Sequence, residues 1–126
     1  MASMHNNQVD QEQRSWKIKL GQFKQENVLL KYRLSEMVDI NEGNNFLQMA
    51  EYFQNELLSA DDKLKKLLKS LEKFSDQYWK PENENESAKH TIKDYNKLKN
   101  EMIQFENRFI RLRKEFNEKM LEDTRH

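Results

Sequence analysis

Histidine and carboxylate side chains are the residues of this chain whose types are suited to binding a metal ion. A di-iron site in a helical bundle needs several inward Glu residues and paired Glu-x-x-His motifs, but the chain has only three histidines, His5, His90 and His126. Glu86 and His90 lie one helical turn apart and supply half of such a site. Because no second histidine completes it, we expect His90 to be a surface residue, and we expect neither a metal nor a cofactor.

Catalytic motifs are absent from the sequence. No glycine-rich phosphate loop, nucleophile elbow or Ser-His-Asp set occurs, and the lack of cysteine excludes thiolate nucleophiles, thiolate metal sites and disulfides. Carboxylate pairs are frequent, but they are expected in a helical chain of which 35% is charged. We therefore predict that the protein is not an enzyme and has no small-molecule substrate.

A basic segment is the one candidate for binding an anionic partner. Taken alone, it is typical of a membrane-surface or calmodulin-target helix. However, Lys plus Arg equals Asp plus Glu at 22 each, whereas nucleic-acid binders normally carry a basic excess. We expect a solvated face that lies next to the acidic residues 82–86, and nucleic-acid binding is not expected. The lysines of this segment are Lys63, Lys65, Lys66, Lys69, Lys73 and Lys80.

The elements that position these side chains are long helices. Only two Gly and one Pro occur in 126 residues, whereas β-sandwich and α/β folds need turn residues every ten or twenty positions. Apolar residues instead recur at alternating intervals of four and three, which is typical of helices that pack along one stripe. The stripe positions are Val9, Gln13, Trp16, Leu20, Phe23, Asn27, Leu30, Leu34 and Met37; Phe46, Ala50, Phe53, Leu57, Ala60, Leu64, Leu67, Leu71, Phe74 and Tyr78; and Ala88, Thr91, Tyr95, Leu98, Met102, Phe105, Phe109, Leu112 and Phe116.

Two connections divide this pattern into three helices. Gly43 and the asparagines beside it predict a C-cap in the left-handed conformation, and Pro81 prevents the second helix from continuing. Ser59-Ala60-Asp61-Asp62 is also an N-cap pattern, but the heptad phase runs through it, so we predict one continuous second helix, with a break near Ser59 as the alternative. The predicted helices are 8–41, 45–80 and 86–122, and the predicted disordered ends are 1–7 and 123–126.

The short connections predict the fold class. Consecutive helices joined by short loops lie antiparallel, so we expect an all-α, antiparallel three-helix (up-down-up) bundle with long coiled-coil-like helices, and a single domain over 1–126. This order also brings the acidic residues between 36 and 56 near the basic residues between 108 and 119. Asn27 interrupts the first stripe, and we expect it to fix the register of the helices, with a polar hook for a ligand as the alternative.

Apolar residues outside the stripes are the clearest functional signal. A three-helix core widens the buried stripe by one position per heptad, but that does not account for Ile18 with Tyr32 or for Ile103 with Ile110, which are spaced by whole heptads. Aligned exposed apolar residues indicate an interface. The widened core accounts for Leu47, Leu68, Ile92 and Met120. The candidate interaction surface is Ile18, Tyr32, Trp79, Ile103 and Ile110.

The first turn between helices carries a resemblance to other proteins. Leu30-x-x-Arg33-Leu34-Ser35-Glu36 followed by Ala50-Glu51-x-Phe53-Gln54-Asn55 resembles short all-helical bacterial proteins that have no known activity. The similar part covers about a quarter of the chain. The resemblance implies a polar network at this turn formed by Arg33, Glu36, Glu51 and Gln54.

The function that these observations favour is a non-catalytic helical interaction or scaffold module. We expect it to act by self-association, as a homodimer, or by binding a helix of another protein. The alternative is a regulatory binder of nucleic acid or of an anionic surface through the lysines of the second helix. A third candidate, by analogy of fold alone, is a spacer of the spectrin type within a longer chain. No apolar run reaches the roughly 20 residues of a membrane span, and residues 1–14 lack the apolar stretch of a secretory signal, so we expect the protein in the cytoplasm.

Overall fold

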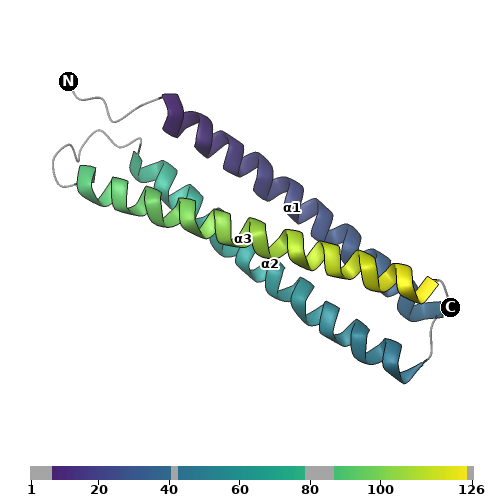
Figure 1. Ribbon diagram of the computed structural model, residues 1–126. Helices are drawn as coiled ribbons and strands as arrows, with labels where there is room; N and C mark the ends of the chain where they lie inside the picture. Colours follow the sequence, from purple (N-terminus) through teal and green to yellow (C-terminus); the bar gives the residue numbers. More distant parts are fainter. Residues whose placement is uncertain (1–6, 41–42, 79–86, 125–126) are drawn as a thin grey trace.

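The computed structural model of the protein describes residues 7–40, 43–78 and 87–124. These residues form three helices, α1 (Asn7–Ile40), α2 (Asn44–Tyr78) and α3 (Ser87–Thr124), and they contain no strand. α2 runs antiparallel to α1 and to α3, so the chain passes up, down and up along the bundle (Figure 1). The predicted all-α three-helix bundle is confirmed.

The helices begin and end within two residues of the predicted boundaries. α2 is continuous through Ser59, so the alternative of two shorter helices is wrong. Ala60, the next residue, is buried and keeps the heptad spacing of the buried residues on both sides of it. The predicted disordered ends lie mostly outside the described residues. Within the described part they are wrong, since α1 already includes Asn7 and α3 extends to Thr124.

The predicted left-handed C-cap at Gly43 is also wrong. No described residue has a positive φ. The carbonyl oxygen of Gly43 instead accepts the first backbone hydrogen bond of α2, from the amide of Leu47 at 3.0 Å. Gly43 therefore leads into α2 and adopts a conformation that does not require glycine.

The predicted stripes form the core of the bundle. All stripe positions within 13–34, 46–74 and 98–116 are buried, and the stripe residues Val9, Met37 and Tyr95 are partly buried. Aromatic side chains join the helices across this core, with the ring of Phe53 at 5.3 Å from that of Phe116 between centroids. The heptad spacing thus predicts which side of each helix is buried.

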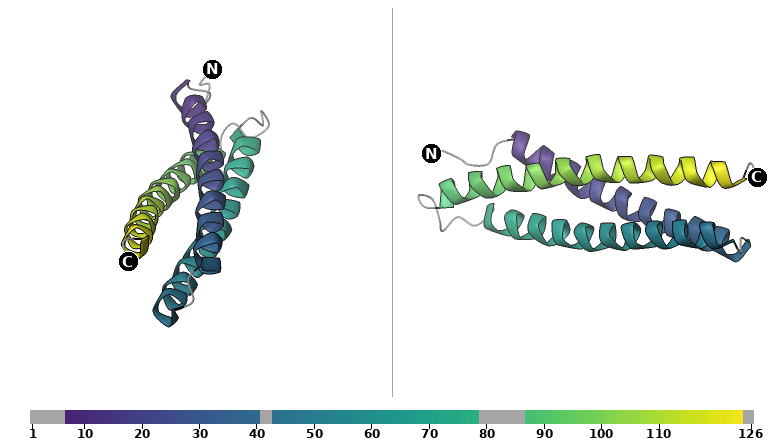
Figure 2. Two further views of the ribbon diagram at one scale, coloured as in Figure 1. Left: turned by 90° about the vertical axis from the view of Figure 1, so that its right-hand side faces the viewer. Right: turned by 60° about the horizontal axis from the view of Figure 1, so that its bottom comes forward.

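The three helices diverge towards the ends of the bundle (Figure 2). α1 and α3 each pack closely along α2 but approach one another less closely. Two predictions of the widened core are wrong: Leu47, in the first turn of α2, and Ile92, near the start of α3, are exposed, because each projects about 100° around its helix from the buried stripe. Leu68 is partly buried and Met120 is buried, as predicted.

Candidate interaction surface

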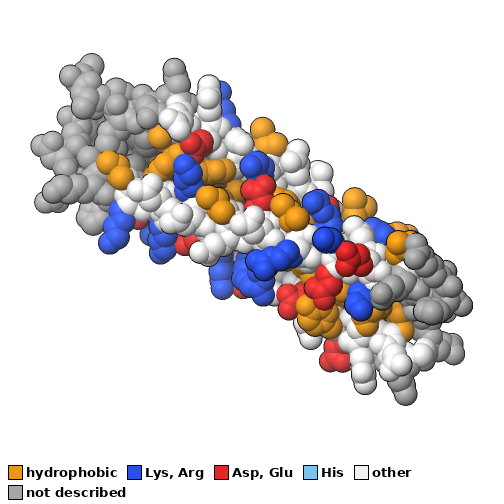
Figure 3. Space-filling model, in the orientation of Figure 1, with side chains coloured by type: hydrophobic (Ala, Val, Ile, Leu, Met, Phe, Trp, Pro, Cys, Tyr) orange, Lys and Arg blue, Asp and Glu red, His pale blue; other side chains and the backbone are white. Residues whose placement is uncertain are grey.

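The outer side of α1 carries an uncharged stripe from Ile18 to Tyr32. At 3.6 residues per turn its residues project within a sector of about 120°, opposite the buried stripe. Their side chains are exposed, with 61% of Ile18 and 62% of Tyr32 accessible to solvent, and hydrophobic side chains project along the edge of the molecule that α1 forms (Figure 3). The outer α1 stripe consists of Ile18, Gly21, Gln22, Gln25, Val28, Leu29 and Tyr32.

Gly21 lies near the middle of the outer α1 stripe. Glycine within a helix costs about 1 kcal/mol relative to alanine, so its presence there calls for a physical reason. A Cβ atom built on Gly21 meets no other atom within 4 Å. The packing of the bundle therefore does not require glycine at this position. The position instead leaves a shallow gap in the stripe where another backbone or side chain can approach α1 closely.

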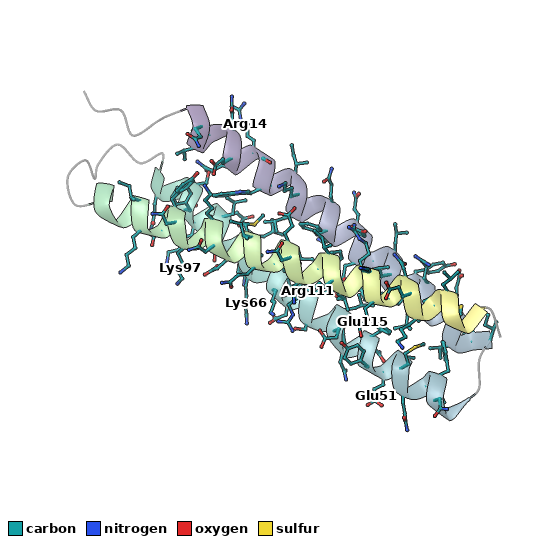
Figure 4. The ribbon with its side chains drawn as sticks, viewed as in Figure 1. Arg14, Glu51, Lys66, Lys97, Arg111 and Glu115 are labelled. Carbon is teal, nitrogen blue, oxygen red and sulfur yellow. The ribbon has the colours of Figure 1, made fainter. Side chains whose placement is uncertain are left out.

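Charged groups frame the outer α1 stripe at both ends. Arg14 and Glu36 are exposed and fall within the same sector, one before Ile18 and the other after Tyr32. Arg14 projects from the outer side of α1 (Figure 4). The Tyr32 hydroxyl is hydrogen-bonded to the Glu36 carboxylate, and this hydrogen bond, with the negative charge of Glu36, raises the pKa of Tyr32 above its usual value.

A row of polar contacts joins α1 to α3 beside this stripe. Lys19 pairs with Glu106 at 3.7 Å, Glu26 with Arg113 at 2.6 Å, and Arg33 donates a hydrogen bond to Asn117 at 3.1 Å. On α1 these residues recur every seven positions, so they lie in one line along the helix. We call this set of contacts the polar row.

The predicted residues of α3 lie beyond the polar row. Ile103 and Ile110 are both exposed. Around the circumference of α3, the side that faces α1 carries Glu106 and Arg113, and the two isoleucines project from the next side, farther from α1. The structure thus brings Ile18 together with Tyr32, and Ile103 together with Ile110, but separates the two pairs by the polar row. The remaining predicted residue, Trp79, lies outside the described residues.

Arg33 contacts α3 at the end where the first two helices are connected. Besides its hydrogen bond to Asn117, its guanidinium carbon lies 5.6 Å from the centre of the Phe116 ring, a distance typical of a cation–π contact. The wider polar network inferred for this turn, with Glu51 and Gln54, stays a prediction.

Asn27 lies at the centre of a buried contact between α1 and α2. Its side chain has no exposed area, and its Nδ2 donates hydrogen bonds to the carbonyl oxygen of Leu57 at 3.0 Å and to Oδ1 of Asp61 at 2.6 Å. Lys31 forms an ion pair with the other oxygen of Asp61. Burial alone would raise the pKa of Asp61, but the hydrogen bonds from Lys31 and Asn27, together with nearby lysine charge, outweigh it and lower the pKa. The geometry agrees with a role of Asn27 in fixing the register.

A basic groove lies between α2 and α3. It has a volume of 580 Å³, its floor is formed by the buried Leu67 and Phe105, and Glu101 is its single acidic lining residue. Lys and Arg side chains gather on this side of the molecule (Figure 3), and Lys66 and Arg111 come to it from different helices (Figure 4). The groove cations are Lys63, Lys66, Arg108 and Arg111.

The basic groove corrects part of the predicted charge pairing. Arg108 does pair with an acidic residue of the predicted range, Glu56, at 3.6 Å. Arg113, however, pairs with Glu26 of α1, which precedes the predicted acidic range of 36–56, and Arg111 lines the groove together with the lysines of α2. The acidic residues 82–86, predicted beside the lysines, lie outside the described residues.

The described part of the chain shows neither a cluster of metal ligands nor a membrane-spanning stretch. No group of three or more His, Asp or Glu side chains there is arranged to hold a metal ion, and the side chains of all three histidines lie outside that part. Within the same ranges, α1, α2 and α3 each lack an apolar stretch long enough to cross a membrane.

Neither a protein-family model nor a curated protein nor a solved structure matches this chain. The function is therefore inferred from the geometry of the surface itself.

Proposed function

We propose that the protein is a non-catalytic helical interaction module that packs the outer α1 stripe against another helix, either of a second copy or of a partner protein. One observation supports this proposal above the others: the seven exposed residues of the outer α1 stripe, spread over positions 18–32, include no charged residue, in a chain that is 35% charged. Isolated exposed apolar residues are ordinary, whereas aligned ones favour an interface. The cytoplasm is the proposed location.

The binding free energy in this proposal comes from burial of the stripe. Each Å² of apolar surface removed from water contributes about 25 cal/mol, from which the costs of association are subtracted. Tyr32 is the expected hot spot, because tyrosine combines a large apolar area with a hydroxyl. Lys17 and Lys24 flank the stripe on α1 and disfavour a partner that presents basic residues along that edge.

Site-specific photo-crosslinking tests this proposal. A photoreactive phenylalanine analogue replaces Tyr32 in the protein expressed in cells, and the same analogue at Tyr52, an exposed tyrosine on α2, is the matched control. We expect a crosslinked polypeptide from position 32 and little from position 52. No crosslinked product from position 32, or equal products from both positions, would contradict the proposal.

A second candidate function is favoured by the basic groove. Four cations from two helices surround a groove with a single carboxylate, and such an arrangement suits an anionic surface or a nucleic-acid backbone. Two of the cations also contact acidic residues, since Arg108 lies near Glu56 and Lys66 lies 3.1 Å from Asp62. Exposed pairs of this kind contribute little and exchange readily for an anionic ligand.

Heparin chromatography tests the second function. Retention of the wild-type protein at about 0.3 M salt, lost in the double variant Lys66→Glu/Arg111→Glu, would support it. Lys24→Glu, on α1 and outside the groove lining, is the control and should not change retention. Elution of the wild-type protein in the flow-through at low salt would refute this function.

A further inference from the structure

We propose that the occupant of the outer α1 stripe is the same stripe of a second copy of this chain, in an antiparallel arrangement with a two-fold axis at Gln25. The inference rests on the proposed function and identifies its partner. A two-fold interface requires a surface that is complementary to itself. The outer α1 stripe meets this requirement in shape and in the charges at its two ends, whereas the lysines that flank it, Lys17 and Lys24, lie along the same edge in both copies and repel one another.

The shapes of the residues are complementary about Gln25. Antiparallel pairing centred there places Gly21 opposite Leu29 of the second copy, and the same contact repeats on the other side of the axis. Since a Cβ on Gly21 would meet open space within its own chain, the position offers a hole for a leucine side chain, as in knobs-into-holes packing. The exposed glycine, which the bundle does not require, is accounted for by this contact.

Most polar and apolar residues are also matched in this arrangement, with Gln22 opposite Val28 of the second copy as the exception. Ile18 lies opposite Tyr32 of the second copy, so that the two largest apolar groups at the ends of the stripe cover each other. Gln25 lies opposite Gln25 of the second copy, and two carboxamides in that position each donate and accept a hydrogen bond. The stripe thus buries no charge and leaves Gln25, at its centre, with a partner.

The charges at the ends select the antiparallel orientation. Arg14 and Glu36 lie eleven residues before and after Gln25, so antiparallel copies bring Arg14 of one chain to Glu36 of the other at both ends. A parallel pair would place Arg14 opposite Arg14 and Glu36 opposite Glu36, which is unfavourable. The formal net charge of zero removes overall repulsion between copies and favours association.

The first test measures the molar mass of the purified protein by light scattering over a hundredfold concentration range. We expect a concentration-dependent mass rising from that of the 15.4 kDa chain towards twice that value. Leu29→Glu should raise the dissociation constant by at least about tenfold, whereas the control Leu58→Glu, at an exposed leucine of α2, should leave it unchanged. A monomer at all concentrations overturns the inference.

A glycine variant separates the interface from the fold. Gly21→Gln should raise the thermal midpoint of the bundle, since the new side chain enters open space and glutamine is the better helix former, and should raise the dissociation constant by at least about tenfold because it fills the hole for Leu29. A variant that is stabilised but dimerises as well as the wild type overturns the inference.

Cysteine crosslinking determines the orientation, and the absence of native cysteine makes it unambiguous. An equimolar mixture of Ile18→Cys and Tyr32→Cys should form a mixed disulfide dimer under mild oxidation. Disulfides only between identical variants would indicate a parallel pair and overturn the antiparallel arrangement.

The failure of this inference and the failure of the proposed function are distinguishable. A crosslink from position 32 to a different protein, with a monomeric purified chain, overturns the second copy as occupant and retains the interaction module. A dimer that persists in Leu29→Glu but is lost in Ile103→Glu overturns the α1 interface and assigns self-association to α3.

Discussion

Replacing Phe53 by alanine is the sharpest test of how the heptad stripes build the core. The Phe53 side chain is 1% exposed and lies against Phe116 of α3, with their rings perpendicular. Removing it leaves a cavity next to Leu57, which has no exposed area. A buried Phe→Ala change costs about 3–5 kcal/mol, which is a large part of the roughly 5–15 kcal/mol that stabilises a typical domain.

Urea unfolding followed by helical circular dichroism measures this loss. At one dilute protein concentration, so that association does not contribute, we expect the midpoint to fall with little change in slope, because the surface exposed on unfolding is nearly the same. The thermal midpoint should fall by roughly 10–20 °C. Leu58→Ala, at a leucine of the same helix that is 51% exposed, is the control and should cost less than about 0.5 kcal/mol.

A double-mutant cycle with Phe116→Ala isolates the contact between the two rings. We expect a coupling free energy of about 0.5–1.5 kcal/mol in favour of the pair. An unchanged unfolding midpoint in Phe53→Ala, or equal losses in Phe53→Ala and Leu58→Ala, would show that the buried side of α2 has been assigned wrongly and would refute the packing described above.

Three further predictions concern single groups. Because the pKa of Asp61 is lowered in the folded state, its contribution to stability is present above about pH 4 and is lost as the pH falls through the folded value; acid titration should show a shallower loss in Asp61→Asn than in the wild type. Burial, followed by the carboxylate of Glu12, raises the pKa of Tyr95, so stability should fall as the pH rises above about 10, and Tyr95→Phe should remove that fall. Gly21→Ala should stabilise the bundle by about 0.5–1 kcal/mol in urea unfolding at low protein concentration; a destabilised variant would show that the space beside Gly21 is occupied within the monomer.

The buried side of each helix could be predicted from sequence because it follows from one feature, the regular spacing of apolar residues along the helix. A residue such as Leu64 is buried for the same reason as Leu57 and Leu71, namely its place in an uninterrupted pattern of four and three. Leu47 and Ile92 were expected in the core although they lie about 100° from this pattern around their helices, and both are exposed. Likewise, glycine at position 43 indicates a chain reversal but not which helix its backbone joins.

The candidate surface was predicted only in part. Exposure of Ile18 and Tyr32 follows directly from their distance from the buried stripe. Their separation from Ile103 and Ile110 depends on which side of α3 faces α1, and heptad spacing within single helices does not contain that information. The basic groove was missed for a related reason: its lysines and arginines lie more than 40 positions apart in the chain, and only the antiparallel register of α2 and α3 brings them together.

The buried contact of Asn27 has a consequence for how the chain avoids misassembly. The apolar stripes of α1 and α2 repeat every seven residues, so sliding one helix along the other by a heptad again places apolar side chains against apolar side chains. Such a slip would exchange Asp61 for Leu68 or Gln54 opposite Asn27. Leu68 would leave the buried amide without a side-chain acceptor, and Gln54 would replace a charge-assisted hydrogen bond by a neutral one. Either slip would remove the ion pair of Lys31. A single asparagine thus makes the slipped hairpins higher in free energy than the native one, although their apolar contacts are nearly equivalent.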